Sequence, residues 1–256
     1  MITAGIDAGL QDTKIVIFKD NQVLSQVNVT CGSEPTVVVA ERGLRQATES
    51  GRISLGDIQY AVVTGSGRAA VPFVQGQAGL SLCLAKGAEW ISPSIRTVLD
   101  IGAQRTLAVK CQGGIPVKIA TNDRCAAGSG MYLEMVAKVL EIRMEQMLEL
   151  SMQSKSAAEV TSTCAVFAES EIISLIHMKK KREDVLKGVL MALARRISPL
   201  LTSIGWEQDL AIVGGVAKNA GMVEALKEQL GCDLVVPENP ELVAALGAAL
   251  IAQERA

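Results

Sequence analysis

The sequence predicts an α/β protein built from two similar halves, each with a mixed sheet and covering helices. The first indication is a residue series that occurs twice, each time after an apolar strand pattern. It reads Asp-x-Gly-x-Gln-x-Thr at Asp7–Thr13 and again at Asp100–Thr106. The second indication is that a hairpin pattern and then helical patterns follow both copies. The chain has no Gly/Ser-rich linker, so we expect the two halves to pack closely.

The composition is that of an ordinary globular protein. The chain has 256 residues, 49% hydrophobic and 20% charged, which is enough for one large domain or two compact ones. Its net charge of −2 gives no electrostatic footprint for nucleic acid. The first residues lack a signal-peptide pattern, and the longest nearly apolar run, 242–252, is too short to span a membrane. We expect a cytoplasmic protein whose six cysteines are reduced thiols or metal ligands.

The first half is expected to cover residues 1–93. It begins with a strand at ITAGID, followed by a hairpin that joins KIVIFKD to QVLSQVNV through a turn at Asp20–Asn21. A helical pattern at Val37–Glu49, the buried strand YAVVTG and a helix near Gly79–Trp90 complete this half.

The second half is expected to cover residues 94–256. Strands at TVLDIG and TLAVKC are followed by a turn at Gly113–Gly114, the strand PVKIA and several helices. The strand LAIVGG, a helix at Val216–Leu230 and the strand DLVVP come next. A helix from Glu241 ends the chain, and its return to the first half is the alternative to a place in the second.

The two repeated turns suit the phosphates of a nucleotide. A glycine after a strand lets the backbone approach a bulky anion, and the turn amides can point at phosphate oxygens. A carboxylate there would repel phosphate unless a divalent cation lies between them, so Asp7 and Asp100 indicate Mg²⁺. One such turn alone is a weak signal, because many strand-ending turns look similar. Two copies at equivalent places predict a clamp around one nucleotide tail in the cleft between the halves.

A third motif completes the nucleotide pattern. Gly214 and Gly215 follow a strand and open a predicted helix, where the backbone could lie against adenosine. The order of two phosphate turns and then an adenosine motif resembles the sugar kinase, Hsp70 and actin superfamily of ATPases. This resemblance implies two ribonuclease H-like halves with the nucleotide between them.

Two cysteine segments narrow the resemblance. NDRCAAGSGMYLE at 122–134 and STCAVFAESEIISL at 162–175 resemble the signature segments of one ATPase family. Its members are the activators of 2-hydroxyacyl-CoA dehydratases and the ATPase subunits of benzoyl-CoA reductases, and the resemblance runs over residues 2–251. It implies an ATP-dependent electron activator. A ferredoxin or flavodoxin would supply an electron to a shared [4Fe–4S] cluster, and ATP hydrolysis would drive that electron to an acyl-CoA reductase or dehydratase partner.

The resemblance also implies which residues form the site. The expected catalytic residues are Asp7, Asp100 and Gln104. The residues expected to contact the nucleotide lie in the first turn, the second turn, the loop and helix after the first cysteine segment, and the adenosine region: Gly9, Leu10, Gln11, Asp12, Thr13, Lys14, Gly102, Gly128, Ser129, Gly130, Glu134, Gly214, Gly215, Lys218 and Asn239. A helix cap is the alternative role for Asn239.

Cys125 and Cys164 each stand just before a predicted helix. A helix N-terminus lowers the pKa of a thiol and stabilises negative charge, so both positions suit thiolate ligands. A [4Fe–4S] cluster requires four thiolates, whereas the chain offers two in this setting. A cluster shared across a two-fold axis supplies the missing two, and the family resemblance implies the same arrangement. Burial as a small apolar side chain is the alternative, and it is what we expect for Cys31, Cys83, Cys111 and Cys232.

The chain also departs from the dehydratase activators. Leu10 and Gln11 stand where those proteins usually have small hydroxyl residues, and Ala103 and Arg105 replace a glycine and an aspartate. The loss of the acid at 105 is expected to weaken hydrolysis or change its timing. Ala103, with ITAGID and CAVFAE, favours the D-like ATPase of a benzoyl-CoA reductase, which shares its cluster with an unlike ATPase subunit. A homodimeric dehydratase activator is the alternative, and a small-molecule kinase of the same superfamily is a more remote one.

Overall fold

The computed structural model describes residues 1–122, 129–161 and 164–256. The chain forms two compact units. Unit 1 consists of Met1–Val98, Val109–Ile119 and Pro237–Ala256, and unit 2 of Leu99–Ala108 and Ala120–Val236. The boundary at residues 93 and 94 that the repeated motif suggests stays a prediction.

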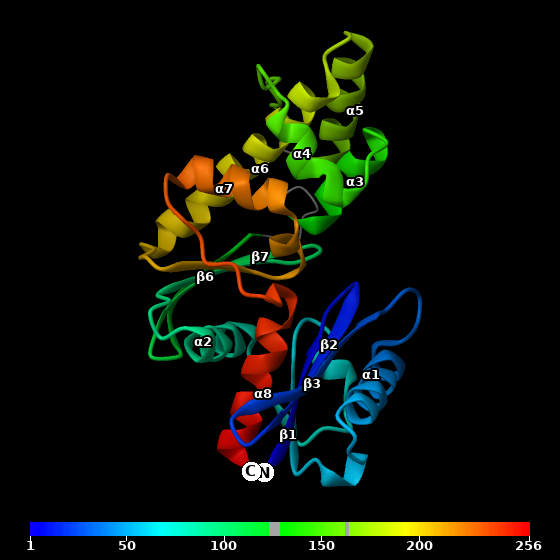
Figure 1. The fold of residues 1–256 in the computed structure, drawn as a ribbon, viewed down its shortest axis with the longest axis vertical. Coiled ribbons are helices and arrows are strands. Elements are labelled where there is room, and N and C mark those ends of the chain that lie inside the picture. The colour runs from blue at the N-terminus through cyan, green and yellow to red at the C-terminus, as the bar shows by residue number, and fades with distance from the viewer. Residues whose placement is uncertain (123–128, 162–163) are drawn as a thin grey trace. The chain divides into compact units, whose positions relative to one another are not determined.

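Unit 1 contains a five-stranded mixed sheet with the order β3-β2-β1-β4-β5 (Figure 1). β1 pairs antiparallel with β2 and parallel with β4, and β2 pairs antiparallel with β3. The predicted hairpin is confirmed, with Asp20 and Asn21 in the left-handed region at φ 49° and 64°. The strands are β1 (Ile2–Ala8), β2 (Asp12–Lys19), β3 (Gln22–Thr30), β4 (Tyr60–Thr64) and β5 (Gly76–Gln77).

Helices cover both faces of this sheet (Figure 1). Ile15 and Ile17 pack with residues of α1 (Thr36–Ser50), whereas Val16 and Phe18 pack with residues of α8 (Val243–Arg255). Because successive side chains of a strand point to opposite faces, burial on both faces explains the continuous apolar run of β2. Beyond α8 lies α2 (Leu80–Ile91), and short 3₁₀ helices occur at Leu55–Asp57, Arg68–Ala70 and Pro240–Leu242.

The contact between α2 and α8 is close enough to require a glycine. A Cβ atom at Gly247 would lie 1.7 Å from the carbonyl oxygen of Cys83. We expect Gly247→Ala to lower the free energy of unfolding by about 1–3 kcal/mol, because one helix must move away from the other. Chemical denaturation measures this. Gly56→Ala is the control, since its Cβ would come no nearer than 3.8 Å to Ser54 Oγ. Equal unfolding midpoints for both variants would contradict the packing described.

The second sheet has the strand order β8-β7-β6-β9. Its strands are β6 (Thr97–Ile101), β7 (Thr106–Gln112), β8 (Ile115–Thr121) and β9 (Leu210–Val213). The helices of unit 2 are α3 (Gly130–Val139), α4 (Met147–Met152), α5 (Ala165–His177), α6 (Arg182–Ile204) and α7 (Ala220–Leu230), with 3₁₀ helices at Met144–Gln146 and Gly215–Lys218.

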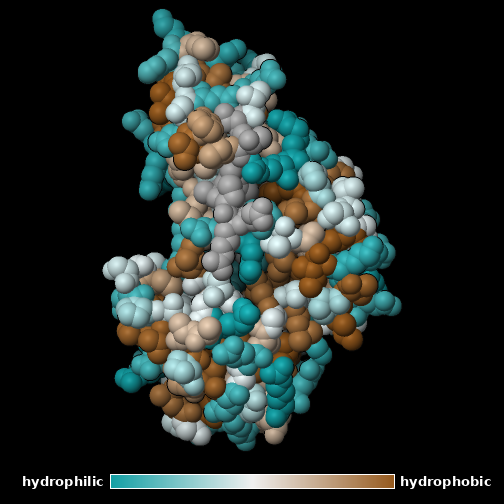
Figure 2. Space-filling model, turned by 180° about the vertical axis from the view of Figure 1, so that it is seen from behind, coloured by the Kyte–Doolittle hydropathy of each residue, from teal (hydrophilic) through white to brown (hydrophobic). Residues whose placement is uncertain are grey.

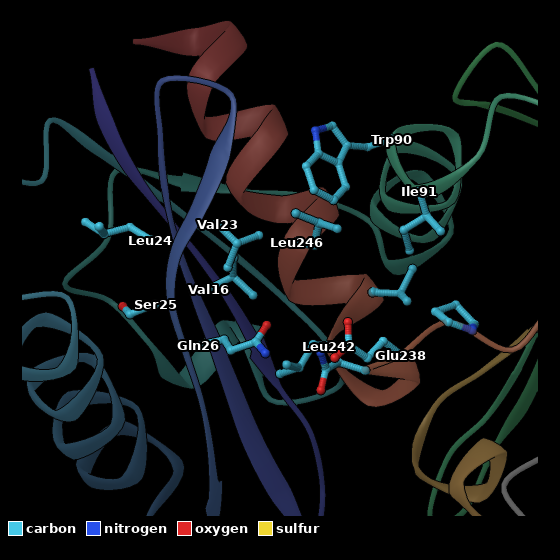
Figure 3. A pocket seen from close by; sticks show the side chains of 13 residues that line it. Val16, Val23, Leu24, Ser25, Gln26, Trp90, Ile91, Glu238, Leu242 and Leu246 are labelled. Atoms are coloured by element: carbon cyan, nitrogen blue, oxygen red, sulfur yellow. The ribbon is translucent and has the colours of Figure 1, made fainter.

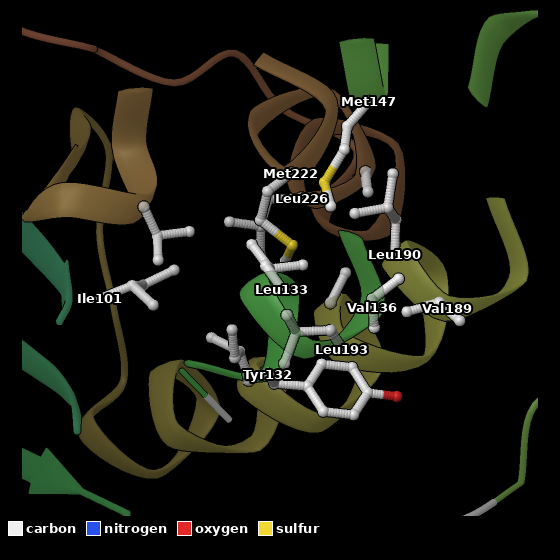
Figure 4. Close-up of a cluster of buried hydrophobic side chains, with 14 of the residues drawn as sticks. Ile101, Tyr132, Leu133, Val136, Met147, Val189, Leu190, Leu193, Met222 and Leu226 are labelled. Atoms are coloured by element: carbon white, nitrogen blue, oxygen red, sulfur yellow. The ribbon is translucent and has the colours of Figure 1, made fainter. Parts of the chain in front are cut away.

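Helices and strand ends meet in one large core in unit 2. Figure 4 shows Leu133 and Val136 of α3 beside Leu190 and Leu193 of α6, with Met222 of α7 above them. All five side chains are buried. This core fixes α3 against the helices that follow it. Among the described residues no helix is both long and apolar enough to serve as a membrane span.

Two predicted elements differ from the structure. The strand expected at DLVVP is wrong: Val235 forms only an isolated bridge to Ala211, and Pro237 has no N–H to continue the pairing. The helix expected from Val216 begins later, at Ala220. Asn219 explains the interruption, because its side-chain oxygen accepts a hydrogen bond from Met222 N at 2.9 Å and caps α7.

Candidate functional site

The first repeated turn joins β1 to β2. Gly9 N donates to the carbonyl oxygens of Asp7 and Asp12, each at 3.1 Å, and Lys14 Nζ donates to Asp12 O at 3.3 Å. Leu10 lies at the tip with 53% of its surface exposed. The hydroxyl of Thr13 is buried and lies 3.6 Å from Cys31 Sγ. The backbone between Gly9 and Asp12, rather than the side chain of Thr13, is therefore the part of this turn that a ligand can reach.

The second repeated turn joins β6 to β7 and is hydrogen-bonded to the N-terminus of α3. Gly102 N donates to Arg105 O at 2.8 Å and closes the turn. Gly130 N donates to Gly102 O at 2.9 Å, and Met131 N donates to Ala103 O at 3.0 Å. The first two amides of α3 are thus bound to carbonyl oxygens of the turn. α3 and the second turn form one connected structural element.

Predicted site residues of unit 2 gather around this turn. Gln104 Nε2 lies 3.3 Å from Met131 Sδ. Ser129 is the buried N-cap residue of α3, and the half-buried Glu134 lies one turn further along the helix. Cys125 and Gly128, which the sequence also places in the site, lie outside the described residues.

The adenosine motif lies next to the second aspartate. Gly214 follows β9 with φ 83°, and a Cβ atom there would lie 2.4 Å from Asp100 Oδ1. Gly215 and Lys218 are exposed and delimit a short 3₁₀ helix rather than the start of an α-helix. The structure therefore brings a glycine of the third motif to the carboxylate of the second.

Asn239 lines a cavity within unit 1. The cavity has a volume of about 550 Å³ and lies between β2, β3, the end of α2 and the start of α8 (Figure 3). None of the residues of the first turn lines it. Asn239 is the N-cap residue of the 3₁₀ helix at Pro240–Leu242, although its side chain makes no capping hydrogen bond. Of the predicted nucleotide residues in unit 1, it alone is separate from the turn.

Cys164 is the N-cap residue of α5 and is half-buried. The two large apolar side chains that follow it, Val166 and Phe167, are exposed by 69% and 70%. In Figure 2, brown (apolar) and teal (polar) residues are interspersed in the part of unit 2 that carries α3 to α5 in Figure 1. The thiol thus stands at a helix N-terminus beside an exposed apolar surface.

The remaining cysteines have different surroundings. Cys31, Cys83 and Cys111 are buried, as expected, whereas Cys232 is half-buried. Burial raises the pKa of Cys83 to about 12 and the pKa of Cys111 to about 11. These two thiols therefore stay protonated near neutral pH, which is unsuitable for a metal ligand. In the part of the chain that the structure describes, no three His, Cys, Asp or Glu side chains gather where a metal ion could bind.

Glu171 has a role that the sequence did not reveal. Its Oε1 accepts hydrogen bonds from Thr161 N at 3.0 Å and from Thr161 Oγ1 at 2.9 Å. This carboxylate ties Thr161 to the middle of α5. A glutamate in an amphipathic helix is common, and only the fold brings it to Thr161.

Comparison with known proteins gives one family. The model of the BadF/BadG/BcrA/BcrD ATPase family matches residues 4–252. The chain is 41% identical to the activator of lactoyl-CoA dehydratase from Anaerotignum propionicum, over 100% of this chain and 99% of that protein. It is 30% identical to a subunit of the benzoyl-CoA reductase from Thauera aromatica, over 90% of this chain and 83% of that protein.

Solved structures agree with these relatives. The activator of the 2-hydroxyisocaproyl-CoA dehydratase from Clostridium difficile, with bound ADPNP, superposes with a TM-score of 0.93 at 35% identity, covering 100% of this chain and 95% of that one. A ROK hexokinase from Thermus thermophilus, at 15% identity and a TM-score of 0.54 over 100% and 99% of the chains, shows the fold alone. The predicted α/β fold class of the sugar kinase and actin superfamily is confirmed.

Proposed function

The chain belongs to the BadF/BadG/BcrA/BcrD ATPase family, and on that premise we propose that it is an ATP-dependent electron activator of a 2-hydroxyacyl-CoA dehydratase. The observation that carries the proposal is its 41% identity, over the whole chain, to a protein described as a dehydratase activator. Both repeated turns, the adenosine glycines and Cys164 lie within the matched residues 4–252.

The choice of partner follows from the relatives. Identity to the dehydratase activators from A. propionicum and Clostridioides difficile is 41% and 35%, against 30% for the benzoyl-CoA reductase protein. This order supports the alternative considered above, a self-sufficient homodimer, over the D-like half of an unlike pair. Ala103 and Arg105 then distinguish this chain within the activators rather than assigning it to the reductase proteins.

In this proposal the two turns hold the nucleotide. The amides of Gly9 and Gly102 close the two turns, so backbone N–H groups of the residues that follow these glycines in each turn would donate hydrogen bonds to phosphate oxygens. Lys14 would neutralise part of the phosphate charge. Asp7 and Asp100 would hold Mg²⁺ through its water shell, and Gln104 would orient the attacking water. Gly214, Gly215 and Lys218 would lie against the adenosine.

Cys164 has the properties of one ligand to an iron–sulfur cluster. It is the N-cap residue of α5, and its thiol is only half-buried. Cys125 and Cys164 of two copies would together supply four thiolates. When bound, such a cluster supplies a one-electron carrier of low potential. The exposed Val166 and Phe167 are suited to contact the second copy, because apolar area beside the ligand is buried on association.

Nucleotide and thiolates are connected through α3. The amides of Gly130 and Met131 are bonded to the second turn, so a displacement of that turn by the nucleotide must displace the N-terminus of α3. Cys125 precedes this helix in the chain, and α3 packs against α5, which begins after Cys164. A change at the phosphates can therefore reach both thiolate segments through packed elements.

We propose a cytoplasmic setting with a reduced ferredoxin or flavodoxin as the electron donor.

Activation of a partner enzyme tests this function. The anaerobically purified chain, with a reductant and Mg²⁺–ATP, is expected to start turnover by a 2-hydroxyacyl-CoA dehydratase component and to hydrolyse ATP without any other ATPase subunit. Reactions without ATP are the control. Activity that appears only after a homologous ATPase subunit is added, and then with benzoyl-CoA reductase, would transfer the chain to the heterodimeric class. Phosphorylation of a small molecule without activation of either system would contradict the proposal.

A further inference from the structure

The two units share a feature that the repeated motif does not contain. In unit 1, Asp7 of β1 is aligned with Thr64 of the parallel strand β4, and Gly65 comes directly after Thr64. A Cβ atom at Gly65 would lie 2.4 Å from Asp7 Oδ1 and 2.5 Å from Ala8 O. The backbone of Gly65 therefore lies directly against the carboxylate of the first motif.

Unit 2 repeats this contact with different neighbouring residues. Gly214 follows β9, the strand next to β6, and its Cβ atom would lie 2.4 Å from Asp100 Oδ1 and 2.6 Å from Ile101 O. The φ angles of Gly65 and Gly214 are 90° and 83°. The sequences TGSGR and VGGVAK around them share only the glycine after the strand. Both units have a glycine against the aspartate carboxylate although the neighbouring residues differ. This points to a role of the glycine that concerns the aspartate.

Other left-handed glycines lack this contact. Gly32 and Gly205, with φ angles of 56° and 60°, have no atom within 4 Å of an added Cβ. A glycine is needed at those two places only because of its backbone angle. At Gly65 and Gly214 the space itself is also occupied, by a carboxylate oxygen and a carbonyl oxygen.

We propose that Gly65 and Gly214 are positioning residues that hold the carboxylates of Asp7 and Asp100 in the orientation needed to meet the Mg²⁺ of a bound nucleotide. With the glycine backbone against Oδ1, each aspartate loses the rotamers that would turn it toward that side. A carboxylate that is already ordered before binding loses little conformational entropy when the cation binds. This inference rests on the proposed nucleotide site.

The test measures how strongly Mg²⁺ tightens ADP binding, by calorimetry with and without Mg²⁺. Gly65→Ala is expected to reduce the Mg²⁺-dependent gain in affinity about tenfold or more, as replacements next to metal-binding groups do. Its affinity for ADP without Mg²⁺ should stay near the parental value. Gly214→Ala is expected to lose the same gain and also some affinity without Mg²⁺, because this glycine would also contact adenosine.

Gly32→Ala and Gly205→Ala are the matched controls, one in each unit. They also have a positive φ angle but crowd no carboxylate, so they should keep the full effect of Mg²⁺. The backbone of Gly205, with φ 60° and ψ 60°, strains an alanine less than that of Gly214, with φ 83° and ψ 176°, so thermal unfolding of every variant is recorded beside the binding data. Equal loss in the controls, or a full Mg²⁺ effect in folded Gly65→Ala, would overturn the inference. So would failure of Gly65→Ala and Gly214→Ala to fold when both controls fold, because the glycines would then serve only the fold.

A double-mutant cycle separates this inference from the proposed function. Asp7→Ala alone should lose the Mg²⁺ effect, and adding Gly65→Ala to it should cause no further loss, because the glycine acts through the aspartate. An additional loss in the double variant would overturn the positioning role. If Asp7→Ala keeps the parental Mg²⁺ effect, the nucleotide site itself is assigned wrongly, whatever the glycine variants do.

Discussion

Replacement of Asp7 or Asp100 by asparagine is expected to reduce the rate of Mg²⁺-dependent ATP hydrolysis by about a hundredfold or more. Asparagine has nearly the shape of aspartate, so the contacts with Gly65 and Gly214 can be kept. It lacks the negative charge that would hold the hydrated cation between the protein and the phosphates. The measurement is ATP turnover at saturating Mg²⁺, with thermal unfolding recorded on the same samples to verify folding.

Asp57 and Asp184 provide controls in the two units. Asp57 Oδ2 accepts hydrogen bonds from Ser54 N and Ser54 Oγ, and Asp184 Oδ1 accepts one from Ser154 Oγ. These hydrogen bonds lower the pKa of both carboxyl groups and occupy them with local structure, away from the two turns. Asp57→Asn and Asp184→Asn should hydrolyse ATP at the parental rate. If the variants at Asp7 and Asp100 do the same, the two turns are not the phosphate site.

Cys125→Ser and Cys164→Ser, prepared without oxygen, are each expected to lose the iron of the protein and to dissociate into single chains. Bonds between thiolates and iron would join the two copies, and the apolar contact around Val166 and Phe167 would have to hold the dimer alone. ADP binding should survive, because the nucleotide residues are not altered. Iron analysis and mass measurement under native conditions record both effects.

Cys232→Ser is the matched control for these variants. Cys232 is half-buried like Cys164 and also lies in unit 2, yet burial raises its thiol pKa. It should keep its iron and remain a dimer. Full iron content and an intact dimer in both the Cys125 and the Cys164 variant would place the cluster elsewhere.

Local patterns in the sequence were sufficient to predict the repeated turns and the hairpin. Asp7, Gly9 and the strand that precedes them form a signal within a few residues, and Asp20–Asn21 is a turn by residue type alone. The α/β fold class followed from the repeat of this plan. The helix break at Asn219 was missed because a buried side-chain cap competes with an otherwise continuous apolar pattern.

Contacts between distant residues could not be predicted in the same way. The approach of Gly65 to Asp7 depends on the parallel pairing of β1 with β4, which a single sequence does not reveal. Gly214 was expected to contact adenosine, whereas its contact with Asp100 emerged only from the fold. Likewise, the contact between Glu171 and Thr161, which is 10 residues earlier in the chain, is visible only in the fold.

The amount of iron per chain, determined together with the native mass of the anaerobically purified protein, tests the central claim most directly. One [4Fe–4S] cluster shared by two copies predicts about two iron atoms and two sulfides per chain, in a particle of twice the chain mass of 27.0 kDa. ADP should bind to this particle without releasing its iron. About four iron atoms in a single-chain particle, or a stable dimer that holds no iron when prepared without oxygen, would contradict a cluster shared across the dimer axis.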